Sequence, residues 1–164
     1  MDKQNRRSHQ MIKKIHPIAG VIGFLTILMF WTSTAYSELF GTHATVAAVK
    51  IMVLNGMFIL VPAMAIVGAS GMSMGSRRKD APARAKKKRM PFIAANGLLI
   101  LLPLAFYLES KASTGAFDNT FYILQAIELI AGATNLFLMG LSIRDGRAMG
   151  NRRRLAAVEA KPRD

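Results

Sequence analysis

Four apolar stretches, each close to the length of a membrane span, restrict this chain more than any other feature of its sequence. They run over residues 17–36, 45–70, 91–108 and 120–143, and charged residues are rare within them. The hydrocarbon core of a bilayer is about 30 Å thick and is crossed by roughly 20 helical residues. Backbone N–H and C=O groups find no water there, so each stretch must be a helix. The sequence therefore predicts an all-α integral membrane protein with four transmembrane helices.

The distribution of basic residues predicts how these helices are oriented. Of the 22 Lys and Arg residues, 20 lie in residues 1–15, 71–90 and 144–164. Short basic segments stay on the cytoplasmic side of a membrane. We therefore expect residues 16–143 to form an antiparallel bundle in a bacterial-type inner (plasma) membrane. Both termini and the basic loop 71–90 would then lie in the cytoplasm. The net charge of +13 reflects this topology and contact with anionic lipid headgroups, and we expect no binding to nucleic acid.

The fourth stretch is the most polar of the four. Gln125, Glu128 and Asn135 are spaced by three and seven residues, so they share one helix face. A charged residue at the membrane centre costs about 2.5–3.5 kcal/mol, so this face must turn toward the other helices or internal water. Lys50 is the candidate partner of Glu128, because both are expected in the outer half of the membrane. These polar groups serve either as hydrogen-bonding contacts between helices or as a functional site.

A short motif occurs twice in the chain. Residues 55–62 and 96–103 share the pattern Asn-Gly-x-x-Ile-Leu-x-Pro. Proline inside a helix removes one backbone hydrogen bond, so a kink is expected at the end of each motif. Asn55 and Asn96 would then line the space between the kinked helices. The motif is interpreted either as paired packing kinks or as the broken helices that mark a transporter site.

The first stretch carries small and aromatic residues at separate levels. Gly20 and Gly23 permit close approach of another helix, which favours self-association or a larger membrane complex. Trp31 and Tyr36 are expected at the outer interface of the membrane.

Few residues in the sequence are suited to cofactor chemistry. The chain has no cysteine, which excludes disulfides, thiolate catalysis and iron–sulfur ligation, and its three histidines all lie outside the predicted spans. A haem b near the inner surface, held by His16 and by Met72, Met90 or Met139, remains an alternative. No motif of a catalytic triad, zinc site or phosphate-binding loop is present. The sequence therefore favours a protein that is not an enzyme.

Together these observations predict a small, non-catalytic membrane protein, either an accessory subunit or a binder of a small hydrophobic ligand in a polar cavity. The candidate residues of that interior are Lys50, Asn55, Asn96, Gln125, Glu128 and Asn135. One alternative is a haem b-binding redox protein ligated through His16. A third is an oligomeric proton-coupled transporter that uses Glu128. In each case we expect a homo-oligomer or a larger membrane complex.

Overall fold

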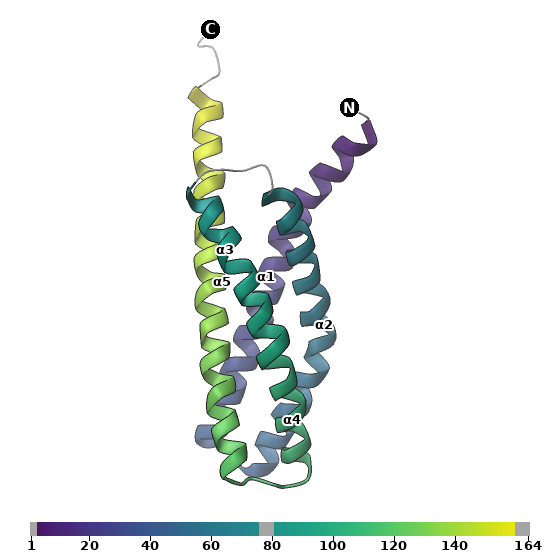
Figure 1. Ribbon diagram of the computed structural model, residues 1–164, viewed down its shortest axis with the longest axis vertical. Helices are drawn as coiled ribbons and strands as arrows, with labels where there is room; N and C mark the ends of the chain where they lie inside the picture. Colours follow the sequence, from purple (N-terminus) through teal and green to yellow (C-terminus); the bar gives the residue numbers. More distant parts are fainter. Residues whose placement is uncertain (1–2, 76–80, 160–164) are drawn as a thin grey trace.

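The computed structural model describes residues 3–75 and 81–159, apart from the side chains of residues 3–10, 12–14, 72–75, 81–87, 149 and 152–159. Throughout this part the chain forms helices joined by short connections. The elements are α1 (Lys3–Phe40), α2 (His43–Gly75), α3 (Ala81–Asn96), the π-helical turn η1 (Gly97–Leu101), α4 (Leu102–Ser113) and α5 (Asn119–Glu159). Figure 1 shows them packed along one long axis, with α3, η1 and α4 following one another as a single rod.

Four segments of the described chain are long and apolar enough to cross a membrane. They are Ile15–Phe40, His43–Gly71, Lys88–Ser113 and Asn119–Ala148. The four predicted spans are therefore confirmed, and they indicate a multi-pass membrane protein. The start of α1 and the end of α5 lie at the same end of the bundle (Figure 1). We call this end, which carries Arg89 and Arg144, the basic end, and the opposite one the far end.

The helices extend further toward the basic end than the predicted spans. α1 and α3 begin well before Pro17 and Pro91, where those spans were expected to start. Most of the predicted loop 71–90 is helical, and residues 76–80 lie outside the described part. Lys, Arg, Gln and Ala have high helix propensity, so these basic segments continue the helices beyond their apolar stretches.

The predicted helix end at Arg144, Asp145 and Gly146 is absent, because α5 continues through these residues to Glu159. Arg89 on α3 donates a hydrogen bond of 2.8 Å to Asp145, which ties the two helices together at this level. Among the described residues, the only positive φ belongs to Gly115. Gly146 therefore does not adopt the left-handed conformation with which glycine commonly ends a helix.

The connection between α1 and α2 consists of Gly41 and Thr42 at the far end. The N–H of Gly41 donates to the carbonyl of Ser37 at 2.9 Å. The hydroxyl of Thr42 accepts a hydrogen bond of 3.3 Å from the N–H of Thr45 and so caps the start of α2. Such a short connection makes α1 and α2 neighbours along their length, as expected from the sequence.

The start of α5 is held by a capping carboxylate. Oδ1 of Asp118 accepts a hydrogen bond of 2.8 Å from the N–H of Phe121, and its other oxygen binds the ammonium of Lys111 at the end of α4. His43, the first residue of α2, stacks on Phe117 with ring centroids 4.1 Å apart. These contacts join the ends of α2, α4 and α5.

We expect Asp118→Ala to lower the midpoint of thermal unfolding at neutral pH and to have little effect in strong acid. The hydrogen bonds from Lys111 and from the N–H of Phe121 hold the pKa of Asp118 below its usual range. The carboxylate therefore stabilises the folded chain above about pH 3.9, the ordinary value for Asp. That contribution disappears as the pH falls through the lowered pKa. A difference between the two proteins that persists in strong acid would show that the carboxylate is not the cause.

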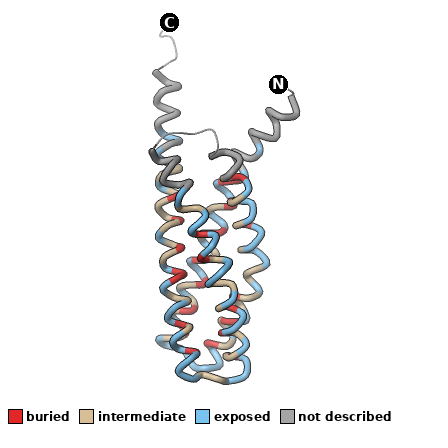
Figure 2. Tube along the Cα trace, viewed as in Figure 1, coloured by how far each residue is buried: buried red, intermediate tan, exposed pale blue. Residues whose placement is uncertain are grey.

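Apolar side chains form three buried clusters along the bundle. The cluster at the far end contains Val46, Leu108 and Phe121, and the other two lie around Phe30 and Ile27. Figure 2 shows that buried residues line the inside of the bundle and that exposed ones cover its outside. Many of the exposed residues are large and apolar, as expected of a surface in contact with lipid; examples are Leu25, Phe58, Leu99, Ile130 and Phe137.

The glycines of α1 face the inside of the bundle. A Cβ atom on Gly23 would lie 3.2 Å from the sulfur of Met64 on α2, and one on Gly20 would lie 3.9 Å from Val67. These small residues therefore serve the contact between α1 and α2. The close approach of another helix that the sequence predicted at these glycines is made by α2.

The two copies of the repeated motif adopt different structures. α2 remains an α-helix across Pro62, whereas the π-helical turn η1 comes just before Pro103. In η1 the N–H of Leu102 donates to the carbonyl of Gly97, five residues earlier. The wider turn reduces the clash that a proline ring makes with the carbonyl four residues before it. The two motifs therefore differ in backbone structure, with an unbroken α-helix at Pro62 and a π-helical turn before Pro103.

Candidate functional site

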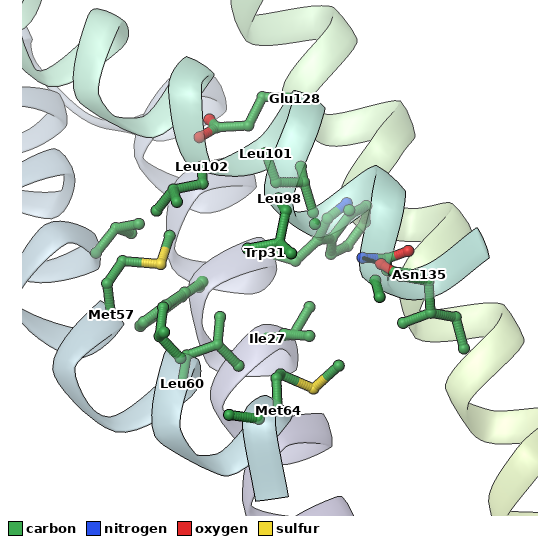
Figure 3. Close-up of a pocket in the computed structure, with 18 of the residues that line it drawn as sticks. Ile27, Trp31, Met57, Leu60, Met64, Leu98, Leu101, Leu102, Glu128 and Asn135 are labelled. Atoms are coloured by element: carbon green, nitrogen blue, oxygen red, sulfur yellow. Dashed lines mark hydrogen bonds between the residues drawn. The ribbon is translucent and has the colours of Figure 1, made fainter. Parts of the chain in front are cut away.

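A cavity of about 450 Å³, the central cavity, lies in the middle of the bundle. α2 contacts α3 and α4 but not η1 between them, and the cavity occupies this gap. Its wall is largely apolar and comes from α1, α2, α3, η1, α4 and α5, with Ile27, Leu60, Met64, Leu98 and Leu129 among its residues. Glu128 and Asn135 bring polar groups to it from α5 (Figure 3).

The central cavity reaches the outside of the bundle between α2 and η1. Val61 and Leu98 both line the cavity, and 44% and 57% of their surfaces are exposed. In a membrane, this opening would face the lipid rather than either aqueous side. A hydrophobic molecule dissolved in the bilayer can therefore enter without crossing water.

A buried ion pair borders the cavity toward the far end. Nζ of Lys50 donates to Oε2 of Glu128 at 2.5 Å, and Nε2 of Gln125 donates to the same oxygen at 3.0 Å. The side chain of Lys50 is 1% exposed, against 13% for Glu128, which lines the cavity. No described residue donates a hydrogen bond to the other oxygen, Oε1 of Glu128. Glu128 therefore has a carboxylate oxygen that is not bonded to the described chain and could accept a hydrogen bond from a ligand.

The helical spacing explains why Lys50 reaches Glu128. Val46, Lys50 and Val53 lie at intervals of four and three residues and are all buried, so they form one inward face of α2. A lysine on that face must have a partner, since an uncompensated charge in an apolar interior is very unfavourable. Glu128, at the same level on α5, supplies it.

Two asparagines link α3 to α5 toward the basic end, and one of them, Asn135, lines the central cavity. Nδ2 of Asn96 donates to Oδ1 of Asn135 at 2.8 Å and to the carbonyl of Ala131 at 2.9 Å. Asn135 is 2% exposed, and its own amide donates to the carbonyl of Ile93 at 3.4 Å. Both side chains are therefore satisfied by the protein, so their geometry favours a contact between helices over direct ligand binding.

A double-mutant cycle of Asn96→Ala and Asn135→Ala should give a coupling energy of about 0.6–1.7 kcal/mol, the range found for hydrogen bonds between membrane helices. The measurement is the free energy of unfolding of the four proteins in mixed detergent micelles. Asn55→Ala is the matched control, because Asn55 holds the same motif position and is exposed. Coupling between Asn55 and Asn135 as large as that of the buried pair would contradict this interpretation.

Trp31 lies on the wall of the central cavity. The sequence predicted instead that this aromatic residue, near the outer end of its span, would lie at the membrane interface. Nε1 of its indole donates to the backbone carbonyl of Leu129 at 2.9 Å. The approach requires glycine at the facing position, because a Cβ atom on Gly132 would lie 3.0 Å from the indole ring. Trp31 thus packs α1 against α5 and contributes an aromatic ring to the wall of the central cavity (Figure 3).

A second cavity, of about 430 Å³, lies nearer the basic end. It shares Met64, Gly68, Ile93 and Ala94 with the central cavity, so the two spaces adjoin. We call it the basic-end cavity. Its wall includes His16 from α1 and Arg147 from α5.

His16 and a methionine meet on the wall of the basic-end cavity. Nδ1 of His16 lies 2.7 Å from the hydroxyl of Ser70, and that hydroxyl donates to helix carbonyls of α2. A Cβ atom on Gly71 would lie 2.7 Å from the sulfur of Met90 and 3.4 Å from Cε1 of His16. Glycine at this position allows the two side chains to come together.

The candidate interior residues are only partly brought together. Lys50, Gln125 and Glu128 form one group and Asn96 and Asn135 another. Asn55 is exposed on the outside of α2, because it lies two residues from Val53 and thus on the opposite face of the helix. Of the three methionines proposed beside His16, Met90 and Met139 line the basic-end cavity, and the side chain of Met72 lies outside the described part.

Comparisons of this chain with protein-family models, with curated proteins and with solved structures found no match.

Proposed function

We propose that this protein binds a small hydrophobic ligand in the central cavity and directs a hydrogen-bond donor of that ligand toward Glu128. It acts without catalysis, as an accessory or binding component of a bacterial-type inner membrane. We further propose that the spans are antiparallel and that the basic end and both termini lie in the cytoplasm; the support is that 20 of the 22 Lys and Arg residues flank the predicted spans on that side. We also propose a homo-oligomer or a larger membrane complex as its working form.

The observation that carries this proposal is one partly exposed carboxylate, Glu128, on the wall of an apolar cavity. A volume of about 450 Å³ falls within the range of roughly 300–1,000 Å³ typical of small-molecule sites. Such sites combine apolar walls with a few placed polar groups. Lys50 and Gln125 occupy Oε2 of Glu128, which leaves Oε1 without a donor from the described chain. The fitting ligand is apolar, enters from the bilayer, and carries a hydroxyl or similar donor.

The chain contains a built-in probe of this cavity, because Trp31 on its wall is the single tryptophan. The test uses a long-chain alcohol brominated in its chain, added to the protein in lipid nanodiscs, with quenching of tryptophan fluorescence as the readout. We expect saturable quenching that the unbrominated alcohol reverses. A hydrogen bond to a charged group contributes about 1.5–3 kcal/mol. The corresponding brominated alkane should therefore bind at least about tenfold more weakly. Quenching that rises linearly with the probe and resists competition would exclude a site.

A second candidate function follows from the basic-end cavity, where a haem b would be held between His16 and Met90. Imidazole and thioether groups are ligands that haem proteins use, His16 and Met90 bring one of each to this wall, and Arg147 on the same wall suits a carboxylate. The test is the absorption spectrum of protein from haem-sufficient cells. A Soret band should be lost in Met90→Leu and kept in Met57→Leu, which changes a methionine of the central cavity. Wild-type protein without a Soret band would end this idea.

A further inference from the structure

A second carboxylate, Glu38, lies close to the Lys50–Glu128 pair. It is half-buried near the end of α1, and the charged groups that act on it are Lys50, Glu128 and His43. Its Oε1 is enclosed and has no hydrogen-bond partner among the described residues. The sequence pattern alone placed Glu38 in a connection between spans and gave it no role.

The charges of this group do not balance. Lys50 supplies one positive charge, and its ammonium is already bonded to Glu128. Gln125 also donates to Glu128, and hydrogen bonds from an ammonium and an amide favour the charged form of a carboxyl group. Glu38 is then the acid without its own cation. An enclosed, uncompensated carboxylate is unfavourable, and a proton is the smallest partner that removes the imbalance.

Gln125 independently indicates that this group of side chains lacks a hydrogen-bond donor. The residue is 3% exposed, and its Oε1 is buried without a hydrogen-bond partner in the described chain. The orientation of the amide is fixed, because its Nε2 faces the carboxylate of Glu128. An acceptor is therefore left facing inward. A hydroxyl donor, such as a protonated carboxyl group or a water bonded to one, would satisfy it.

We propose that Glu38 is a proton-binding site that exchanges with the far side of the membrane and is coupled through Lys50 to Glu128 at the cavity. When Glu38 releases its proton, Lys50 faces two ionised acids and its hold on Glu128 weakens. Only the O–H bond of the Glu38 carboxyl group breaks in this step. Its proton passes to water at the far end, beside His43. The charge of Glu128 is then less neutralised, so it accepts a hydrogen bond from a ligand more strongly. Proton release and ligand binding would thus favour each other.

Infrared difference spectroscopy tests the proton site without any ligand. Wild-type protein in lipid is titrated from acid to alkaline pH, and we expect loss of a C=O stretching band of a protonated carboxyl group that shifts in deuterated water. The band should be absent in Glu38→Gln and kept in Glu109→Gln, which removes a half-buried acid of α4. A band that persists unchanged in Glu38→Gln would overturn the assignment. Glu38→Asp, which retains an acid, should restore a titrating band if Glu38→Gln folds poorly.

The coupling between Glu38 and ligand binding in the central cavity rests on the proposed function. It is tested separately, through the pH dependence of ligand affinity. Binding of the brominated alcohol should tighten several-fold as the pH rises through the infrared transition, and this dependence should vanish in Glu38→Gln. If the infrared band behaves as expected and the alcohol binds equally at all pH values, the coupling is wrong and the proton site stands. If the alcohol does not bind at all, the proposed function fails, and the infrared result still decides the proton site.

Discussion

Replacing Lys50 by methionine is expected to destabilise the protein by about 3–5 kcal/mol, since it removes one partner of a buried ion pair. Methionine keeps the length and apolar stem of lysine, so little packing is lost. The cost comes from Glu128, which would remain in the interior without its cation, with Gln125 as its remaining donor. The measurement is the free energy of unfolding in mixed detergent micelles.

The matched double variant separates charge from packing. Adding Glu128→Gln to Lys50→Met removes the unpaired charge and should recover most of the lost stability. Lys111→Met provides the control for removing a lysine from an ion pair at the surface, because its partner Asp118 is exposed; its effect should be much smaller. If Lys50→Met alone were as stable as wild type, Glu128 would not be an ionised partner of Lys50.

The largest effect on ligand binding is expected from Gly68→Leu. Gly68 lines both cavities, and a Cβ atom placed on it would have nothing within 4 Å. The first atom of a leucine side chain therefore meets no clash, and we expect the remainder to extend into the space where the two cavities adjoin. We expect the affinity for the brominated alcohol, measured by Trp31 quenching, to fall at least tenfold. Stability should be unchanged or higher by up to about 1 kcal/mol, since leucine has the better helix propensity.

Gly140→Leu is the control for the same change of residue. A Cβ atom on Gly140 also meets nothing within 4 Å, and Gly140 lines neither cavity. Its alcohol affinity should equal that of wild type. Equal affinities in all three proteins would place the alcohol outside the cavities.

The sequence predicted those features of the fold that depend on the length of the apolar stretches and on the depth of each residue in the membrane. Four apolar stretches gave four spans, because bilayer thickness and helical rise leave little freedom. The contact between Lys50 and Glu128 could also be expected, since distance along a helix fixes the level of each residue. The spacing of Gln125, Glu128 and Asn135 placed them on one face of α5, and all three contribute to the interior.

The sequence did not predict how each helix is rotated about its axis, because in a membrane the outside of a helix is as apolar as its inside. Asn55 and Asn96 share one motif, but Asn55 is exposed and Asn96 is buried. Trp31 turns inward for the same reason: the space beside Gly132 decides its position. Glu38 was missed because it follows the apolar stretch in sequence, although α1 continues past it to Phe40. The π-helical turn, which depends on the neighbouring helix, has no signature of its own beyond Pro103.

The most direct test of ligand binding in the central cavity is the small-molecule content of the protein purified from native membranes. Wild type, Gly68→Leu and Gly140→Leu are isolated in parallel, extracted with organic solvent and compared by mass spectrometry. We expect a hydrophobic compound with a hydroxyl or similar donor. It should be present at close to one molecule per protein chain in wild type and Gly140→Leu, and depleted in Gly68→Leu. Identical extracts from all three proteins, with bulk lipid alone, would contradict it.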